Sequence, residues 1–368
     1  MHREIFTNIK NFFGNFKGLL SKPQQENFII YVLGLMLPCN KTVNGIAEEL
    51  KIEKNQSSLN RFLTESQWNI KEVYSTLFEF IKPKLTGTVY LIVDDTLCEK
   101  TGEKIKGVAR HFDHNQKRTV LSHSIVCGII KCADVVLPYG IELYRKKETC
   151  NGIKFKTKIS IAKGIIERFL SLEFQSKIIL FDAFYPATEI IKAIGKSAYW
   201  VSNCKKNRLV KVGGFYYSLK QLASYIKPEQ YTEVKIKEKT YFIFEYEAEV
   251  KDIGLIKIVF SKKKRHSGSI SYFISNMLDA GGREVLLHYS ERWSIEVFFR
   301  TAKQTLGLGR YQMRSLKGII KHWCLVAVTY GLLSCLLSSL KKRCATIGKM
   351  CKLIREDIIK TRLRFSVS

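Results

Sequence analysis

The spacing of hydrophobic and polar positions divides the chain into helical and strand-like regions. Apolar residues recur at helical spacing in QENFIIYVLGLML, NGIAEELKI and KEVYSTLFEFIK, and Pro83 then interrupts the pattern. We therefore predict an N-terminal helical region over residues 1–84. The stretch KTVNGIAEELKIEKNQSSLNRFL could form a helix-turn-helix, although the near-neutral charge of this region argues against strong DNA binding by it alone.

Apolar runs of strand length follow from Thr88 onwards. They are VYLIVDD, VLSHSIVCGII, DVVLPYGIELY and KIILFD, and residues 158–172 between the last two have a helical period. The order of three strands, a helix and a strand predicts a mixed α/β sheet.

The C-terminal half continues with a different pattern. Short alternating segments between Asn203 and Asn276, with a helix expected only near residues 219–226, predict an antiparallel β insertion over residues 206–268. From Gly282 to about Leu306 the apolar period is helical, and we expect one long helix there, followed by a helical tail from about Leu316.

Composition and charge narrow the function classes. The 368 residues are 46% hydrophobic and 26% charged with only 6 prolines, which excludes a disordered or collagen-like chain. The net charge of +28 favours a polyanionic partner, above all nucleic acid. The basic residues form four clusters outside the first 80 residues, which are candidate phosphate contacts. The clusters are residues 145–147, the group Lys205, Lys206, Arg208 and Lys211, residues 262–265, and the last 28 residues.

Cysteine usage and the apolar segments indicate a cytosolic protein. The ten cysteines are spread along the chain without a CxxC pair, which fits reduced thiols better than a disulfide framework. The N-terminal 20 residues lack the uninterrupted apolar core of a secretory signal. The uncharged run from Cys324 to Leu340 is short for a membrane span, and we expect a buried helix.

Carboxylates stand next to two of the predicted strands. Asp94 and Asp95 follow YLIV, and Asp182 follows KIILF. A turn at the end of a strand would explain a single aspartate. Burying a charge is costly, however, so carboxylates beside two strands of one sheet favour a shared site for a hard cation, which takes oxygen ligands.

A third carboxylate falls in the predicted long helix, within YSERWSIEVFFRTAK. On a helical projection five polar residues of this segment lie within about 80° of one another. They are Tyr289, Arg292, Glu296, Arg300 and Lys303. Ordinary amphipathicity explains such a face, but it also suits one metal ligand flanked by phosphate donors.

At these residues the chain resembles the DDE transposases of bacterial insertion sequences with the YREK signature, Y-x2-R-x3-E-x6-K. Tyr289, Arg292, Glu296 and Lys303 match that spacing. The motifs IVDDT, ILFD, RW-x-IE and KQ-x-LGL-x-RYQ-x-RS also resemble the subgroup with a β insertion before its last catalytic helix, over about residues 88–318.

The resemblance implies a ribonuclease H-like catalytic core over residues 85–205 and 269–310, followed by a basic helical region over 311–368. It implies an acidic triad of Asp95, Asp182 and Glu296 that holds two Mg²⁺ ions, with Mn²⁺ able to substitute. Asp95 is preferred because the family's catalytic aspartate directly precedes threonine, and Asp94 stays open as the alternative.

The resemblance also implies the partners: double-stranded DNA as transposon ends and target, a second copy of the chain in a homodimer, and no membrane. The place of action would be the bacterial cytoplasm, in association with the nucleoid. The expected DNA-binding residues are Tyr289, Arg292, Arg300, Lys303, Arg310, Arg314, Lys205, Lys206 and Arg208. The β insertion contains no tryptophan, so any base-stacking residue there would be a phenylalanine or tyrosine that the sequence does not identify.

Two other functions remain open: a nuclease of the same fold that does not join strands, and a DNA-binding protein with a decayed site. Zinc binding is the weakest option, because His111-x2-His114 and Cys127-x4-Cys132 are isolated pairs. The absence of a Gly-x-Ser-x-Gly elbow and of a Gly-rich phosphate loop argues against serine hydrolase chemistry and an ATP requirement.

Overall fold

A computed structural model describes residues 2–50, 56–150, 152–251, 253–340, 344 and 346–361, and its chain divides into two compact units. Unit 1 comprises Met1–Thr86, Asp95–Phe155 and Glu296–Ser368, and unit 2 comprises Gly87–Asp94 and Lys156–Ile295. Strand β1 (Thr88–Glu99) and helix α10 (Trp293–Gln304) belong to both, because the boundaries fall inside them. Compactness does not test which segments act together, so the domain ranges given above stay predictions.

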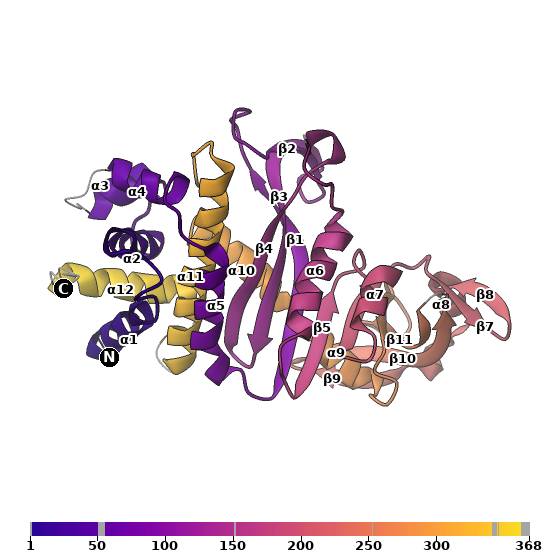
Figure 1. The fold of residues 1–368 in the computed structure, drawn as a ribbon. Coiled ribbons are helices and arrows are strands. Elements are labelled where there is room, and N and C mark those ends of the chain that lie inside the picture. The colour runs from indigo at the N-terminus through magenta and orange to yellow at the C-terminus, as the bar shows by residue number, and fades with distance from the viewer. Residues whose placement is uncertain are drawn as a thin grey trace. The chain divides into compact units, whose positions relative to one another are not determined.

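Unit 1 is mainly helical (Figure 1). Its helices are α1 (His2–Gly14), α2 (Lys22–Met36), α3 (Val43–Leu50), α4 (Gln56–Thr64), α5 (Ile70–Ile81), most of α10, α11 (Leu316–Ser339) and α12 (Ile347–Thr361), with short 3-10 turns at Lys82–Lys84 and Lys147–Thr149. Besides the end of β1, its strands are β2 (Ala109–Asp113), β3 (Arg118–Cys132) and β4 (Val135–Tyr144). These three pair antiparallel in the order β2-β3-β4.

Helix α11 is the central element of unit 1. It packs against α2, α4, α5 and β4, and the backbone N–H of Val136 in β4 donates to the hydroxyl of Ser334 at 2.8 Å. Among the described residues α11 is the one helix long and apolar enough to cross a membrane, but 94% of its most apolar window is buried inside the protein. A helix that is apolar on all sides forms the core of a packed domain, which confirms the predicted buried helix.

Unit 2 contains a mixed sheet. Its strands are the first half of β1, β5 (Ser176–Phe181), β6 (Tyr199–Cys204), β7 (Leu209–Val212), β8 (Phe215–Ser218), β9 (Thr232–Ile236), β10 (Lys239–Val250), β11 (Gly254–Lys262) and β12 (Ser271–Ser275). The order is β1-β5-β6-β12-β11-β10-β7-β8, with β9 paired to β10. Strands β1, β5 and β6 are parallel and the others antiparallel.

Four helices and one 3-10 turn complete unit 2. They are α6 (Lys158–Leu170), α7 (Thr188–Ile194), α8 (Leu219–Tyr225), the turn Pro228–Gln230, and α9 (Gly282–Ser290). Helices α6 and α7 pack against each other, and α9 packs against β6, β9, β10 and β11 (Figure 1). The predicted short antiparallel strands and the helix near residues 219–226 are present, because β7 to β12 are joined by antiparallel pairs and α8 lies among them. Their assignment as an insertion over residues 206–268 stays a prediction.

The predicted mixed α/β fold of the ribonuclease H-like class is confirmed. The four apolar runs form β1, β3, β4 and β5, and the helical stretch between the last two forms α6. In unit 2, the parallel strands follow the order β1-β5-β6. Of the described helices and strands, β2, α7 and β6 were not predicted, and the two strands among them are only five and six residues long.

Two predicted boundaries are wrong. Strand β1 does not end at Asp94 and Asp95 but continues to Glu99. The expected long helix is two helices, α9 and α10, separated by Glu291 and Arg292. The chain tightens there into hydrogen bonds from residue i to residue i−3, such as Arg292 N–H to the Tyr289 carbonyl at 3.0 Å. Neither glycine nor proline marks this break, so the apolar period continued across it without a stop signal.

Two of the buried histidines in unit 1, His123 and His322, contact tyrosine hydroxyls. The Tyr31 hydroxyl lies 2.8 Å from Nδ1 of His322, whose Nε2 lies 3.0 Å from the Gly307 carbonyl. Nδ1 of His123 lies 2.7 Å from the Tyr311 hydroxyl. Burial lowers the pKa of both His123 and His322 to about 4, since desolvation penalises the charged ring.

We predict that acidification from pH 7 to pH 5 destabilises the protein. In this range the unfolded chain, with histidine pKa values near 6.5, binds protons that the folded chain excludes, so the free energy of unfolding falls as the pH falls, by up to about 1.4 kcal/mol per pH unit per histidine. Urea unfolding at pH 5, 6 and 7 measures this slope. The His322→Gln variant should lose about half of the histidine contribution, and an unchanged slope in that variant would contradict the assignment.

Candidate active site

The pairing of β1 with β5 in unit 2 brings two carboxylates together. The parallel register ends with Val93 opposite Phe181, and both residues are fully buried. The next residues along the two chains are Asp94 and Asp182, which are only partly buried. Neighbours in a parallel register lie on the same face of a sheet, so the two carboxylates lie side by side at the carboxyl ends of apolar segments.

Side-chain contacts within unit 2 distinguish the two faces of β1. The Tyr90 hydroxyl lies 2.8 Å from Nδ1 of His288, and Nη1 of Arg292 donates to Oδ2 of Asp94 at 2.9 Å, both within unit 2. Alternate residues of a strand share a face, so Tyr90 and Asp94 lie on one face of β1 and Asp95 lies on the other. The ion pair is shielded, with side-chain exposures of 17% for Arg292 and 18% for Asp94.

Tyr289 joins this cluster from the end of α9. Its ring packs edge-on against Phe273 of β12 with centroids 4.8 Å apart, and the guanidinium carbon of Arg292 lies 5.8 Å from the ring centroid. Burial raises the pKa of Tyr289 to about 12; nearby Asp182 and Asp94 also raise it, and Arg292 opposes them. Tyr289 therefore keeps its hydroxyl proton at neutral pH and can donate it in a hydrogen bond.

Asp182 is oriented by the backbone around it. Its Oδ1 accepts a hydrogen bond from the Phe184 backbone N–H at 2.9 Å, and its carbonyl accepts one from the fully buried Ser202 hydroxyl at 3.0 Å. Sequence reasoning missed Ser202, because a single serine in an apolar strand carries no pattern that points to a site.

Unit 1 contains the predicted site residues Asp95, Glu296 and Lys303. Nζ of Lys303 on α10 donates to Oγ1 of Thr96 at 2.6 Å. Asp95 and Glu296 are partly buried and are the first residues of two segments of unit 1. Because Asp182 belongs to unit 2, the predicted triad is divided between the units, and its assignment remains a proposal.

The described residues contain no group of three His, Cys, Asp or Glu side chains placed to hold a metal ion. Of the histidine and cysteine pairs considered for zinc, His111, Cys127 and Cys132 are buried. The carboxylates Asp95, Asp182 and Glu296 are hard oxygen donors, so their chemistry fits Mg²⁺ or Mn²⁺.

The other predicted DNA-binding residues have different environments. Lys205, Lys206 and Arg300 are exposed. Nη2 of Arg208 donates to the Pro186 carbonyl at 2.8 Å, so this side chain also supports the loop after β5. Arg310 and Arg314 are exposed beside a cavity. Of the basic C-terminal cluster, residues 341–343 and 362–368 lie outside the described residues.

A mixed sheet of this strand order, with carboxylates beside arginine and tyrosine donors, defines the chain as a ribonuclease H-like protein. Residues 15–210, more than half of the chain, match the family model of the DDE superfamily endonucleases, and the chain belongs to this family. The match includes Asp94, Asp95 and Asp182 and ends before Glu296.

One curated relative is similar over a shorter region. The chain is 31% identical over 153 residues to a protein of Microchaete diplosiphon described as the probable transposase for insertion sequence element IS701. The aligned region covers 39% of this chain and 38% of that relative. The chain therefore spans well under half of the length of the relative that it matches.

The environment of Tyr289 generates a prediction about stability. Tyr289→Phe keeps the ring against Phe273 and should change the free energy of unfolding by less than about 1 kcal/mol. Tyr289→Ala removes the ring and should cost about 2 to 3 kcal/mol. Chemical denaturation of both variants compares these values, and equal losses would show that the ring packing contributes nothing.

Proposed function

We propose that this protein is an insertion-sequence transposase that cleaves DNA at the ends of its element and joins the freed ends to target DNA. The observation that carries the proposal is that Asp182 and Asp94 both lie near Tyr289, with Arg292 paired to Asp94, in a chain of the DDE superfamily. The similarity to a relative described as a probable transposase supports transposition as the activity.

We assign Asp95, Asp182 and Glu296 as the carboxylates that bind two Mg²⁺ ions, with Mn²⁺ as a substitute. When bound, such ions activate a water or hydroxyl nucleophile and stabilise the leaving oxygen of an in-line phosphoryl displacement. Hydrolysis breaks the phosphodiester bond at the element's end and leaves a 3′-hydroxyl. Attack by that hydroxyl on a target phosphodiester then forms the joint and releases a target 3′-hydroxyl, without a covalent enzyme intermediate.

The side chains next to the carboxylates would position the DNA. The ion pair with Asp94 holds the guanidinium of Arg292, and the hydrogen bond to Thr96 holds the ammonium of Lys303. Donors that are fixed before substrate arrives stabilise phosphate charge without having to reorganise. Tyr289, which keeps its proton, adds a neutral donor.

The two aspartates of β1 have different roles in this proposal. Asp94 holds Arg292, whose positive charge disfavours a cation on the same carboxylate, and Asp95 binds metal. The reverse assignment is supported by the register, because Asp94 and Asp182 directly follow its last paired residues, Val93 and Phe181. Substitution of each residue distinguishes the two assignments.

The partners follow from the activity. The substrates are double-stranded DNA at the element's ends and in the target, and the chain acts as a homodimer because two ends must be held together. Its place of action is the bacterial cytoplasm, at the nucleoid. The net charge of +28 supports binding to a polyanion of this length.

The proposed cleavage and joining of DNA can be tested directly. Purified protein with Mg²⁺ should cut a plasmid that carries its gene and flanking DNA at the ends of the element, and should then produce joined products with a second plasmid. EDTA and the Glu296→Gln or Asp182→Asn variants should abolish both products while DNA binding persists. Cuts without joined products would identify a nuclease instead, and cuts retained in Glu296→Gln protein would reject the site.

A further prediction distinguishes the roles of Asp94 and Asp95. Asp95→Asn should lower cleavage at least about 1,000-fold, as expected when an electrostatic element of the transition state is lost. Asp94→Asn should lower it less, because Arg292 loses only its holding partner. Single-turnover cleavage rates at saturating protein measure both effects. The opposite ranking would assign the metal-binding role to Asp94.

A further inference from the structure

The helix break at Glu291 and Arg292 contacts the hairpin formed by β9 and β10, within unit 2. Nζ of Lys237, in the two-residue turn of this hairpin, lies 3.0 Å from Oε1 of Glu291. The side chain of Glu291 is 19% exposed and that of Lys237 is 55% exposed. The carboxylate end of this ion pair is therefore shielded from solvent, although the lysine is not.

The backbone conformation of Lys237 is unusual for a lysine. Its φ is 52°, in the left-handed region that glycine adopts readily and most other residues avoid. Two-residue hairpin turns that require this conformation favour glycine or asparagine. The turn therefore carries a lysine at a position where a residue without a long side chain would fit better.

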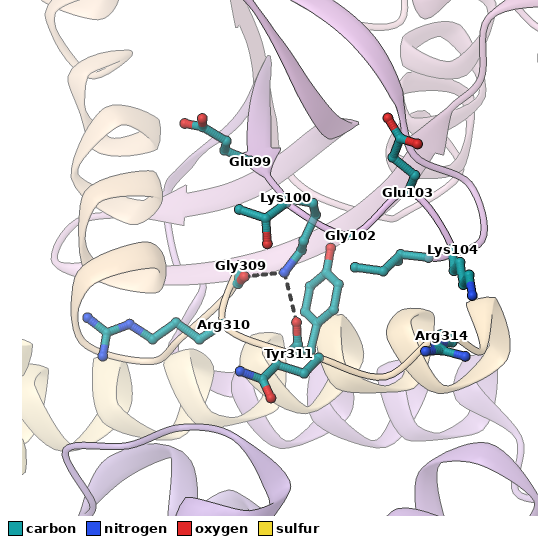
Figure 2. A pocket seen from close by; sticks show the side chains of 12 residues that line it. Glu99, Lys100, Gly102, Glu103, Lys104, Gly309, Arg310, Tyr311 and Arg314 are labelled. Atoms are coloured by element: carbon teal, nitrogen blue, oxygen red, sulfur yellow. Dashed lines mark hydrogen bonds between the residues drawn. The ribbon is translucent and has the colours of Figure 1, made fainter.

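Stability does not account for this lysine. An ion pair with a half-exposed partner contributes little to the free energy of unfolding, because solvent and salt screen it. A lysine that does serve the packing of this chain is Lys100 in unit 1, which is only 9% exposed and donates to the carbonyls of Gly309 and Tyr311 (Figure 2). Lys237 instead contacts a side chain at the helix break.

The residues next to Glu291 belong to the candidate site. Arg292 pairs with Asp94 at 2.9 Å, and Tyr289 lies near Asp94 and Asp182. The backbone of the break is held by hydrogen bonds from residue i to residue i−3, whose geometry is poorer than that of α-helical bonds and which often mark a hinge. Side-chain contacts must therefore help to fix the direction in which Tyr289 and Arg292 point.

We propose that Lys237 and Glu291 are positioning residues of the candidate active site. Their ion pair fixes the helix break, and the break sets the direction of Tyr289 and Arg292. The hairpin of β9 and β10 thereby supports the phosphate donors without touching the reacting atoms. The inference rests on the proposed function, since it assumes that these two donors act on DNA.

Single-turnover cleavage by the full chain tests this role. Lys237→Gly removes the ammonium and relieves the backbone strain, so the melting temperature should stay the same or rise. The cleavage rate at saturating protein should nevertheless fall at least about 5-fold, a typical size for a coupling between sites. The matched control is Lys117→Gly, at an exposed lysine of unit 1 with a φ of 51°, and it should leave the rate unchanged. An unchanged rate in Lys237→Gly, or an equal loss in both variants, would overturn the proposal.

DNA affinity distinguishes positioning from direct contact. The dissociation constant of Lys237→Gly and its salt dependence should match those of the wild type, and a loss confined to affinity would overturn the positioning role. Glu291→Gln should lower the rate by a similar factor, and the double variant should lower it no further, because the two residues act as one unit. Independent, additive losses would contradict the pair.

A measurement without DNA separates this inference from the proposed function. Trp293 directly follows Arg292 and is 59% exposed, whereas the other three tryptophans are buried. Acrylamide quenching of tryptophan fluorescence therefore reports mainly on the helix break. Quenching should increase in Lys237→Gly and stay unchanged in Lys117→Gly, and equal quenching in both variants and the wild type would overturn the proposal. If the wild type cuts no DNA, the proposed function fails, and quenching alone decides whether Lys237 holds the break.

Discussion

The pairing of β1 with β5 is the constraint on which the candidate site depends. Both strands are apolar, and burying them side by side supplies the stabilisation that holds the register from Thr88 opposite Ser176 to Val93 opposite Phe181. Once that register is set, Asp94 and Asp182 must emerge together. Two neighbouring carboxylates repel each other, and the Arg292 guanidinium beside Asp94 offsets part of this repulsion.

Residues of β1 also contact polar side chains of the segment from α9 to α10. In unit 2, Tyr90 contacts His288 and Asp94 pairs with Arg292. In unit 1, Thr96 accepts a hydrogen bond from Lys303. Each contact ties a strand residue to the segment between the start of α9 and the end of α10. Within each unit, residues of the strand thereby hold donors that lie outside it, an arrangement that suits phosphate recognition because the donors need little reorganisation on binding.

Buried polar groups in unit 1 show how a charge can serve the fold instead of the substrate. Lys100 and the histidines at positions 123 and 322 sit among aromatic rings and backbone carbonyls. Burial lowers the pKa of each of these three side chains. Each also contacts a residue far away in the sequence: Lys100 and His123 contact Tyr311, and His322 contacts Tyr31. Some basic residues of this chain therefore stabilise the fold, whereas others, such as Lys205 and Lys206, are exposed at the surface.

The sequence by itself determined the apolar strands, the helix between β4 and β5, the buried character of α11, and the residue types of the site, because these follow from local period and composition. It did not determine the break between α9 and α10 or the extension of β1 to Glu99, since no glycine or proline marks either point. Only the tertiary structure decided that Asp94 lies beside Asp182 and that Lys100 is bound to backbone carbonyls. Register and burial depend on contacts between segments distant in the chain, which no local pattern encodes.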